Sequence, residues 1–217
     1  MDKVNEAATE IANILLEERA VTINTANPYT FVSGTISPIY CDLRLLIGSP
    51  ASRARIVELL IEAINGTVPD NKKDVMAGVA TAGITWAAWV STALEKPMVY
   101  VRDAPKEHGA QRQIEGGVLT GQNALVFEDL TSTGDSAIAA AKALREHGAR
   151  VDHCFSIFTY GFPAATQAFN KEGINLVTLC GISTFLEVAS QKEYISKEDG
   201  QAVKRWLDET QARASAK

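Results

Sequence analysis

Residues 124–137 read ALVFEDLTSTGDSA. Residues 124–127 form a short apolar run, which is typical of a strand buried on both faces. Glu128 and Asp129 follow as adjacent carboxylates at the point where such a strand would end. The stretch therefore predicts one strand of an α/β sheet that carries two acidic groups at its end.

The next residues predict a loop followed by a helix. Residues 131–136 are small hydroxyl residues around Gly134, and residues 137–144 are rich in alanine, which favours a helix. Such a loop can point backbone N–H groups and hydroxyls at a phosphate, and the helix N-terminus adds partial positive charge. Because carboxylates accept hydrogen bonds from sugar hydroxyls, the whole stretch suggests a site for a phosphorylated sugar.

An ordinary turn before a capped helix fits the same spacing. The candidates for the cap are Ser132, Thr133 and Asp135. Of these we expect Asp135 to cap the helix, since a carboxylate facing a phosphate would be repelled. Residues 78–83 have the glycine spacing of a Walker A loop, but Ile84 and Thr85 follow instead of Lys and Ser or Thr.

Composition indicates a globular protein with a sizeable core. The chain has 217 residues, of which 46% are hydrophobic, so we expect one domain. Its net charge of −5 argues against a general nucleic-acid binder, which would usually carry a basic face. No apolar run is long enough to span a bilayer.

The N-terminus and the cysteines favour a cytoplasmic location. Asp2, Glu6 and Glu10 interrupt any apolar region that a signal peptide would need. The three cysteines have no metal-binding spacing, and their odd number favours reduced thiols.

Strand and helix patterns alternate along the chain. The expected strands are residues 75–79, 98–101, 124–127, 151–160 and 176–180. The expected helices are residues 3–19, 50–64, 84–94, 137–144 and 163–169, with two more begun by capping boxes at 184–187 and 196–199. Residues 29–46 predict a hairpin around Gly34. This alternation predicts an α/β fold with a mainly parallel central sheet flanked by helices, and ligands at the carboxyl ends of its strands.

A family resemblance makes the function more specific. LVFEDLTSTGDS (125–136) resembles the phosphoribosyl-pyrophosphate (PRPP) motif of type I phosphoribosyltransferases. Other stretches resemble the bacterial orotate phosphoribosyltransferases in collinear order: SGTISPIYCDLR (33–44), GVATAGITWAAWVS (78–91), KPMVYVR (96–102), KEHGAQRQIEG (106–116) and FTYGFPAA (158–165). The resemblance covers most of the chain.

The resemblance implies a reaction and a set of site residues. Orotate and PRPP would give orotidine 5′-monophosphate and pyrophosphate, a step of pyrimidine (UMP) biosynthesis, with Mg²⁺ held mainly through PRPP and not by a dedicated protein site. The implied catalytic residues are Glu128, Asp129, Lys106 and His108. The implied PRPP-binding residues are Arg102, Lys106, His108, Glu128, Asp129, Leu130, Thr131, Ser132, Thr133, Gly134, Asp135 and Ser136.

The resemblance also implies how the substrates are enclosed. Thr81, Ala82 and Gly83 would face the pyrophosphate, although close packing of a helix on the sheet explains the same small residues. Ser132 and Tyr40 would contact orotate, beneath a small hood formed by about residues 20–48 of the single domain, although without the resemblance Tyr40 would be interpreted as a core aromatic.

Residues 102–117 would form a lid that acts on the neighbouring subunit of a homodimer. A solvated surface loop is the alternative interpretation of this polar segment. No nucleic-acid or membrane partner is expected.

Two other functions stay open at this point. Val32 and Ile36 stand where family members carry lysine, so a different base is one alternative. A non-catalytic PRPP sensor that regulates transcription is the other, and a panel of base assays would separate these possibilities.

Overall fold

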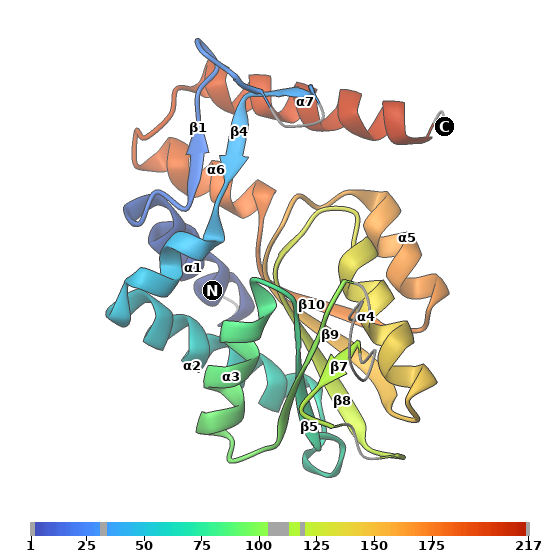
Figure 1. Cartoon of the computed structure of the whole chain (residues 1–217). Helices are drawn as coiled ribbons and strands as arrows, with labels where there is room; N and C mark the ends of the chain where they lie inside the picture. Colours follow the sequence, from blue (N-terminus) through green and yellow to red (C-terminus); the bar gives the residue numbers. More distant parts are fainter. Residues whose placement is uncertain (1–2, 31–33, 104–112, 118–119, 216–217) are drawn as a thin grey trace.

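The computed structural model describes residues 3–30, 34–103, 113–117 and 120–215. Its centre is a six-stranded sheet in the order β10-β9-β8-β5-β6-β7 (Figure 1). The strands are β5 (Val75–Val79), β6 (Met98–Val101), β7 (Ile114–Glu115), β8 (Asn123–Thr131), β9 (Arg150–Thr159) and β10 (Asn175–Gly181). Every neighbouring pair is parallel except β6 with β7. The predicted α/β fold with a mainly parallel sheet is confirmed.

Helices cover both faces of the sheet. In Figure 1, α1, α2 and α3 lie on one side, and α4 and α5 lie on the other. The helical segments are α1 (Lys3–Glu17), η1 (Leu43–Gly48), α2 (Pro50–Thr67), η2 (Asp70–Lys72), α3 (Gly83–Ala93), α4 (Asp135–Glu146), α5 (Pro163–Lys171), α6 (Ile182–Gln191) and α7 (Lys197–Ser215). Among these described helices, none combines the length and apolarity that crossing a bilayer requires.

The two faces of the sheet belong to two hydrophobic cores. Side chains alternate along β8, so Leu125 and Phe127 join a core with α1, α2 and α3. Ala124 and Val126 point the opposite way and join a second core with α4 and α5. Because both faces are covered, β8 is apolar at every position of this run. The strand is thereby held rigidly up to the acid pair that follows.

A small ribbon of paired strands stands above the carboxyl ends of the sheet strands (Figure 1). We call residues 21–30 and 34–41 the N-terminal ribbon. It contains two antiparallel pairs, β1 (Val21–Ile23) with β4 (Ile39–Cys41), and β2 (Tyr29–Thr30) with β3 (Ile36–Ser37). The second pair confirms the predicted hairpin, whereas the pairing of β1 with β4 was not predicted.

Helix α7 lies beside the ribbon and is bonded to it. Trp206 Nε1 donates a hydrogen bond to the carbonyl oxygen of Ile36 at 2.7 Å. The Thr25 hydroxyl donates to the Asp199 carboxylate. Asp199 also exchanges hydrogen bonds with Ser196, which confirms the predicted capping box at the start of α7.

Most predicted element bounds agree with the structure, and two predictions are wrong. β8 runs through the acid pair, because its pairing with β9 continues to Thr131 opposite Thr159. Glu128 and Asp129 are therefore strand residues. Thr184 does not start a helix, since α6 begins at Ile182 directly after β10.

Candidate active site

The loop between β8 and α4 encloses a small cavity. Gly134 turns the chain with a φ of 86°, a left-handed conformation that glycine adopts without steric penalty. A Cβ atom there would also collide with the ring of Phe169 on α5. The cavity has a volume of about 100 Å³ and is lined by Glu128, Leu130 and residues 131–137. The predicted loop residues thus surround one space at the N-terminus of α4.

Asp135 lines this cavity and does not cap the helix. Its Oδ2 atom accepts a hydrogen bond from Thr133 Oγ1 at 2.8 Å. The N-cap position is Gly134, and no side chain of the described loop caps α4 there. The prediction that Asp135 is a cap is wrong, because the left-handed turn places glycine at the N-cap and moves Asp135 into the first turn.

Thr131 presents a polar group that the described residues leave unpaired. Its Oγ1 atom is buried and has no hydrogen-bond partner among them. The residue lies in the lining of the loop cavity. Because a buried hydroxyl without a partner costs free energy, this position favours a ligand with hydrogen-bonding atoms.

The acid pair lies next to the loop cavity in the last part of β8. The Asp129 N–H donates to Glu128 Oε1 at 3.2 Å, and the Leu130 N–H donates to Asp129 Oδ1 at 2.7 Å. Burial raises the pKa of Glu128, and the charge of Asp129 raises it further. Burial also raises the pKa of Asp129, although hydrogen bonds from its neighbours and the positive charge of Arg44 oppose that rise. The site therefore favours a positively charged group beside these carboxyls.

The small-residue turn Thr81, Ala82 and Gly83 lies beside β8. A Cβ atom at Gly83 would collide with the carbonyl oxygen of Phe127 and would approach the Cα atom of Glu128. Helix α3 therefore begins in direct contact with the strand backbone, which only glycine permits. This close helix–sheet packing accounts for Gly83. Thr81 is exposed, and a role in facing pyrophosphate stays a prediction.

A second cavity adjoins the first. It has a volume of about 300 Å³ and is lined by residues from β5, β6 and α4, including Arg102 and Asp103. Asp135 and Ser136 line both cavities. The Arg102 guanidinium lies at this opening, with Nη1 4.0 Å from Glu115 Oε1. The structure thus brings Arg102 to the edge that carries the acid pair.

Three residues named from the sequence in connection with the candidate site lie outside the described part of the chain. They are Val32, Lys106 and His108. Their predicted roles stay predictions.

The N-terminal ribbon contributes aromatic side chains to the same edge. Tyr40 has 39% of its surface exposed, and its ring centre lies 5.4 Å from that of Tyr29. The hydroxyl of Tyr160, the residue directly after β9, donates to Cys41 Sγ at 3.2 Å. Burial raises the pKa of Cys41 to about 12, so this thiol stays protonated and joins the ribbon to the sheet. Ile36 is 63% exposed.

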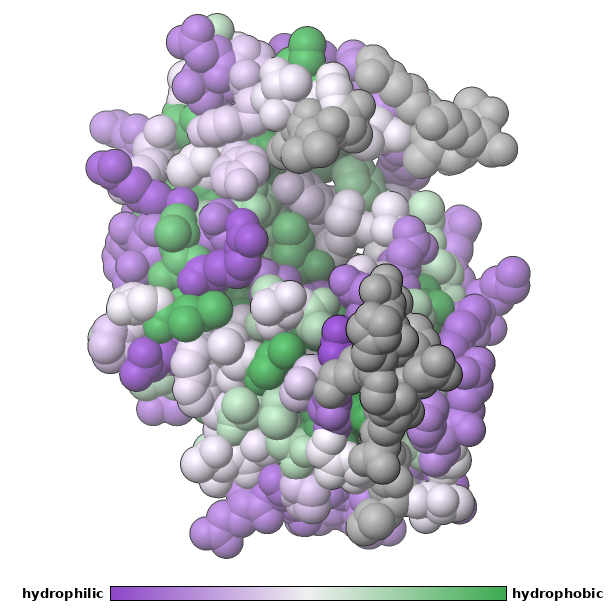
Figure 2. Space-filling model, viewed as in Figure 1, coloured by the Kyte–Doolittle hydropathy of each residue, from purple (hydrophilic) through white to green (hydrophobic). Residues whose placement is uncertain are grey.

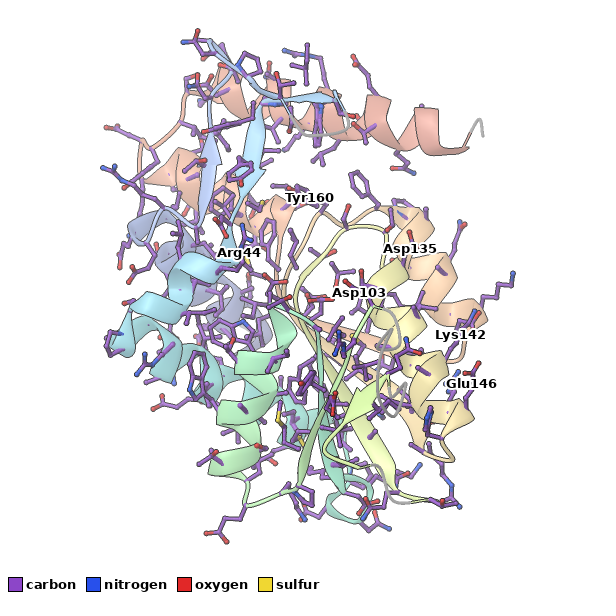
Figure 3. All side chains as sticks on the ribbon, in the orientation of Figure 1. Arg44, Asp103, Asp135, Lys142, Glu146 and Tyr160 are labelled. Carbon is purple, nitrogen blue, oxygen red and sulfur yellow. The ribbon has the colours of Figure 1, made fainter. Side chains whose placement is uncertain are left out.

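Sequence reasoning missed Arg44 and the contacts of Tyr160. Figure 3 shows Arg44, Asp103, Asp135 and Tyr160 around one opening, and Figure 2 shows that the surface is hollowed there, below α7. A signal for Arg44 was present, because it ends the stretch 33–44 that carries the family resemblance. The contact of Tyr160 with Cys41 gave no local signal, since 119 residues separate the two.

The strand order places the loop and the acid pair at a binding position. β5 continues to β6 on one side and β8 continues to β9 on the other, so the order reverses between β5 and β8. Ligands of open α/β sheets bind at such a point. The model of the phosphoribosyl transferase domain matches residues 49–168, which include this point of the sheet, the acid pair and the loop cavity, so the chain is a member of the phosphoribosyl transferase class.

Comparison with known proteins narrows the class. The orotate phosphoribosyltransferase of Coxiella burnetii is 46% identical over 199 residues, which cover 92% of this chain and 94% of the relative. That of Listeria monocytogenes is 46% identical over 197 residues, covering 91% and 93%. The crystal structure of the Aeropyrum pernix enzyme of the same name has a TM-score of 0.72 and 30% identity, covering 86% of this chain and 99% of that one. The chain belongs to the orotate phosphoribosyltransferase family. These relatives do not favour another base or a regulatory role.

Proposed function

We propose that this chain transfers ribose 5-phosphate from PRPP to orotate. A ring nitrogen of orotate loses its proton to solvent and bonds to the anomeric carbon as the bond from that carbon to pyrophosphate breaks. The products are orotidine 5′-monophosphate and pyrophosphate. The observation that supports this proposal best is the loop cavity beside the acid pair, in a chain 46% identical to orotate phosphoribosyltransferases.

In this proposal the loop holds the 5′-phosphate. Its backbone N–H groups and hydroxyls surround a cavity of about 100 Å³ at the N-terminus of α4. The helix dipole adds partial positive charge there, and the unpaired Thr131 hydroxyl is available as a donor. Ser132, which lines the same cavity, would contact orotate.

Glu128 and Asp129 would hold the ribose and stabilise the transition state. Breaking the bond to pyrophosphate leaves positive charge on the sugar ring. Two carboxyl groups fixed by β8 can accept hydrogen bonds from the ribose hydroxyls and offset that charge without rearranging. Their raised pKa values would fall as positive charge develops beside them.

Cations would stabilise the departing pyrophosphate. Arg102 lines the adjoining cavity of about 300 Å³. We assign the same task to Lys106 and His108, with His108 donating a proton to the leaving group. These residues belong to segment 102–117, which we infer closes over the site of the neighbouring subunit in a homodimer and excludes water.

Orotate would bind between the sheet and the N-terminal ribbon, which serves as the hood. Tyr40 offers an exposed aromatic ring on that side. Aromatic rings stack on planar bases, which supports this side for the base.

Glu128 and Asp129 could contribute oxygen ligands to Mg²⁺, but they do not form a complete ligand set by themselves. Carboxylate and phosphate oxygens are hard ligands that suit this ion. Within the described residues, no group of three or more histidine, cysteine or acidic side chains is placed to hold a metal. Most of its ligands would therefore be PRPP oxygens, and the bound ion would neutralise charge on the leaving group.

The test is a turnover assay on the purified protein. With orotate, PRPP and Mg²⁺, we expect orotate to disappear and pyrophosphate to form in equal amounts. Uracil, adenine and hypoxanthine serve as control bases. Pyrophosphate release with a control base and not with orotate would contradict the proposed substrate. PRPP binding without pyrophosphate release from any base would contradict an enzymatic role.

A further inference from the structure

Arg44 stands beside the acid pair, on the side of the N-terminal ribbon. It lies in the first turn of η1, directly after β4, and η1 contacts β8. Its side chain is 64% exposed. Figure 3 shows it across the opening from Asp135. The positive charge of Arg44 is close enough to act on Asp129, whose pKa is raised by burial and lowered in part by this arginine.

One edge of the guanidinium is fixed and the other is free for a ligand. Arg44 Nε donates to Asp42 Oδ1 at 2.7 Å. Within the described part of the chain, Nη1 and Nη2 of Arg44 donate to no other residue. Asp42 therefore orients the side chain and leaves two parallel N–H donors. A carboxylate can accept one hydrogen bond from each of them through its two oxygens.

The acidic groups of the opening would disfavour an anionic base, and a cation on its side would offset this. Glu128, Asp129, Asp103 and Asp135 all contribute acidic groups around it. Arg102 is paired with Glu115, at the cavity lined by β5, β6 and α4. Arg44 supplies positive charge on the opposite, ribbon side.

We propose that Arg44 determines base specificity by donating paired hydrogen bonds from Nη1 and Nη2 to the carboxylate of the base. This inference rests on the proposed function. An aromatic base without the carboxylate would gain nothing from the guanidinium, which stays solvated at 64% exposure, so the contact would favour the carboxylated base over neutral pyrimidines. A lysine would keep the charge but lose the paired geometry.

A purely structural role would have a different signature. An exposed arginine–aspartate pair contributes little to stability, so Arg44→Gln should fold normally. If Arg44 acted only by holding Asp129 ionised, its loss would affect PRPP and the turnover rate. If Arg44 binds the base carboxylate, its loss lowers the affinity only for ligands that carry this carboxylate.

The experiment compares two nucleotides that differ only in the carboxylate. Calorimetry measures binding of orotidine 5′-monophosphate and of uridine 5′-monophosphate to wild type, Arg44→Gln, Arg44→Lys and Arg150→Gln. Arg150 is the matched control, because it is exposed at the amino end of β9, whereas the candidate site lies at the carboxyl ends of the strands. Steady-state kinetics give KM for orotate and for PRPP.

For Arg44→Gln we expect the Kd of orotidine 5′-monophosphate to rise about 10- to 100-fold, as for loss of charge-assisted hydrogen bonds. The Kd of uridine 5′-monophosphate and the KM for PRPP should stay unchanged, while the KM for orotate rises. Arg44→Lys should fall between, and Arg150→Gln should match wild type.

Two outcomes overturn the role of Arg44. One is an equal loss of affinity for both nucleotides in Arg44→Gln. The other is an affinity of Arg44→Gln for both nucleotides equal to that of wild type. Either result in a protein that still turns over orotate leaves the proposed function standing. A wild-type protein that binds PRPP but neither converts orotate nor prefers the carboxylated nucleotide contradicts both.

Discussion

In the ligand-free protein, burial disfavours the ionised forms of Glu128 and Asp129 in β8. A positively charged ligand would favour those forms. Burial and the adjacent Asp129 raise the pKa of Glu128 above its ordinary 4.5. A carboxyl with a higher pKa in the folded protein binds its proton more tightly there than in the unfolded chain. Its contribution to stability is therefore fully present below pH 4.5 and is lost as the pH rises from there to the folded-state pKa of about 9.

Glu128→Gln should for this reason stabilise the ligand-free protein, and more so at higher pH. We expect little change in the free energy of unfolding at pH 4.5 and a gain on the order of 1–2 kcal/mol at pH 8. Thermal unfolding at a series of pH values measures it. Glu187→Gln, an exposed change on α6, is the control and should show no such trend. A gain that shrinks as the pH rises would contradict the prediction.

Asp135 places a negative charge in the proposed phosphate site. Asp135→Asn should keep the hydrogen bond from Thr133, because the amide oxygen accepts as the carboxylate does. Removing the charge should strengthen binding of inorganic phosphate and PRPP about 3- to 10-fold, from a Coulomb energy of roughly 1 kcal/mol in water. Calorimetry measures both ligands. Asp152→Asn, at the amino end of β9, is the control; equal affinities in all three proteins would show that the Asp135 carboxylate does not act on the ligand.

At the scale of elements, α7 supports the wall of the proposed base site. Trp206 donates to the backbone of Ile36 at 2.7 Å and packs against Tyr160, with ring centres 6.4 Å apart. The ribbon strands β2 and β3 have only two residues each. Contacts from α7 are thus needed to fix the ribbon position.

Trp206→Phe keeps an aromatic ring and removes the donor. We expect the KM for orotate to rise several-fold with little change in the KM for PRPP, and stability to fall by about 1 kcal/mol. Trp89→Phe is the control, because Trp89 packs on α3 against Trp86, away from the ribbon. Equal changes in both KM values would mean that Trp206 acts on the whole fold and not on the base side.

The sequence predicted the elements whose signal is local. The bounds of β5 and β6 were right, because continuous apolar runs ended by turn residues mark buried strands. The end of β8 was wrong, since pairing with β9 holds Glu128 and Asp129 in strand conformation despite their polarity. The pairing of β1 with β4 was missed because their three-residue runs carry little periodicity.

The candidate site was predictable in its loop and acid pair and less so elsewhere. The loop motif is contiguous, so one stretch of sequence contained it. Arg44 and Tyr160 reach the same opening from separate elements, and no spacing rule brings them together. The φ of Gly134, not the preference of aspartate for caps, decided the place of Asp135.

At the scale of the whole molecule, the proposed lid requires a second copy of the chain. A Lys106→Ala chain then has a defective lid and an intact sugar site, and an Asp129→Asn chain has the reverse. Each homodimer should be nearly inactive. In a mixed dimer, one site receives a good lid and a good acid pair, while the other is doubly defective.

Refolding the two variants together should therefore restore activity. Random pairing makes about half of all dimers mixed, each with one working site, so recovery should reach about a quarter of wild type. Each variant refolded alone is the control, and subunit exchange is checked with differently tagged chains. No recovery despite proven exchange would mean that the lid serves its own subunit or that Lys106 is not needed.

The bond from Trp206 to Ile36 joins segments 170 residues apart, and this separation affects the order of events during synthesis. The ribbon precedes the central sheet in the chain and α7 follows it. At about 5–20 residues per second, the ribbon waits roughly 10–30 s on the ribosome for its partner helix. The sheet and the proposed phosphate-binding loop can form in that interval. A nascent chain should therefore acquire the ability to bind phosphate before it acquires the ability to select a base.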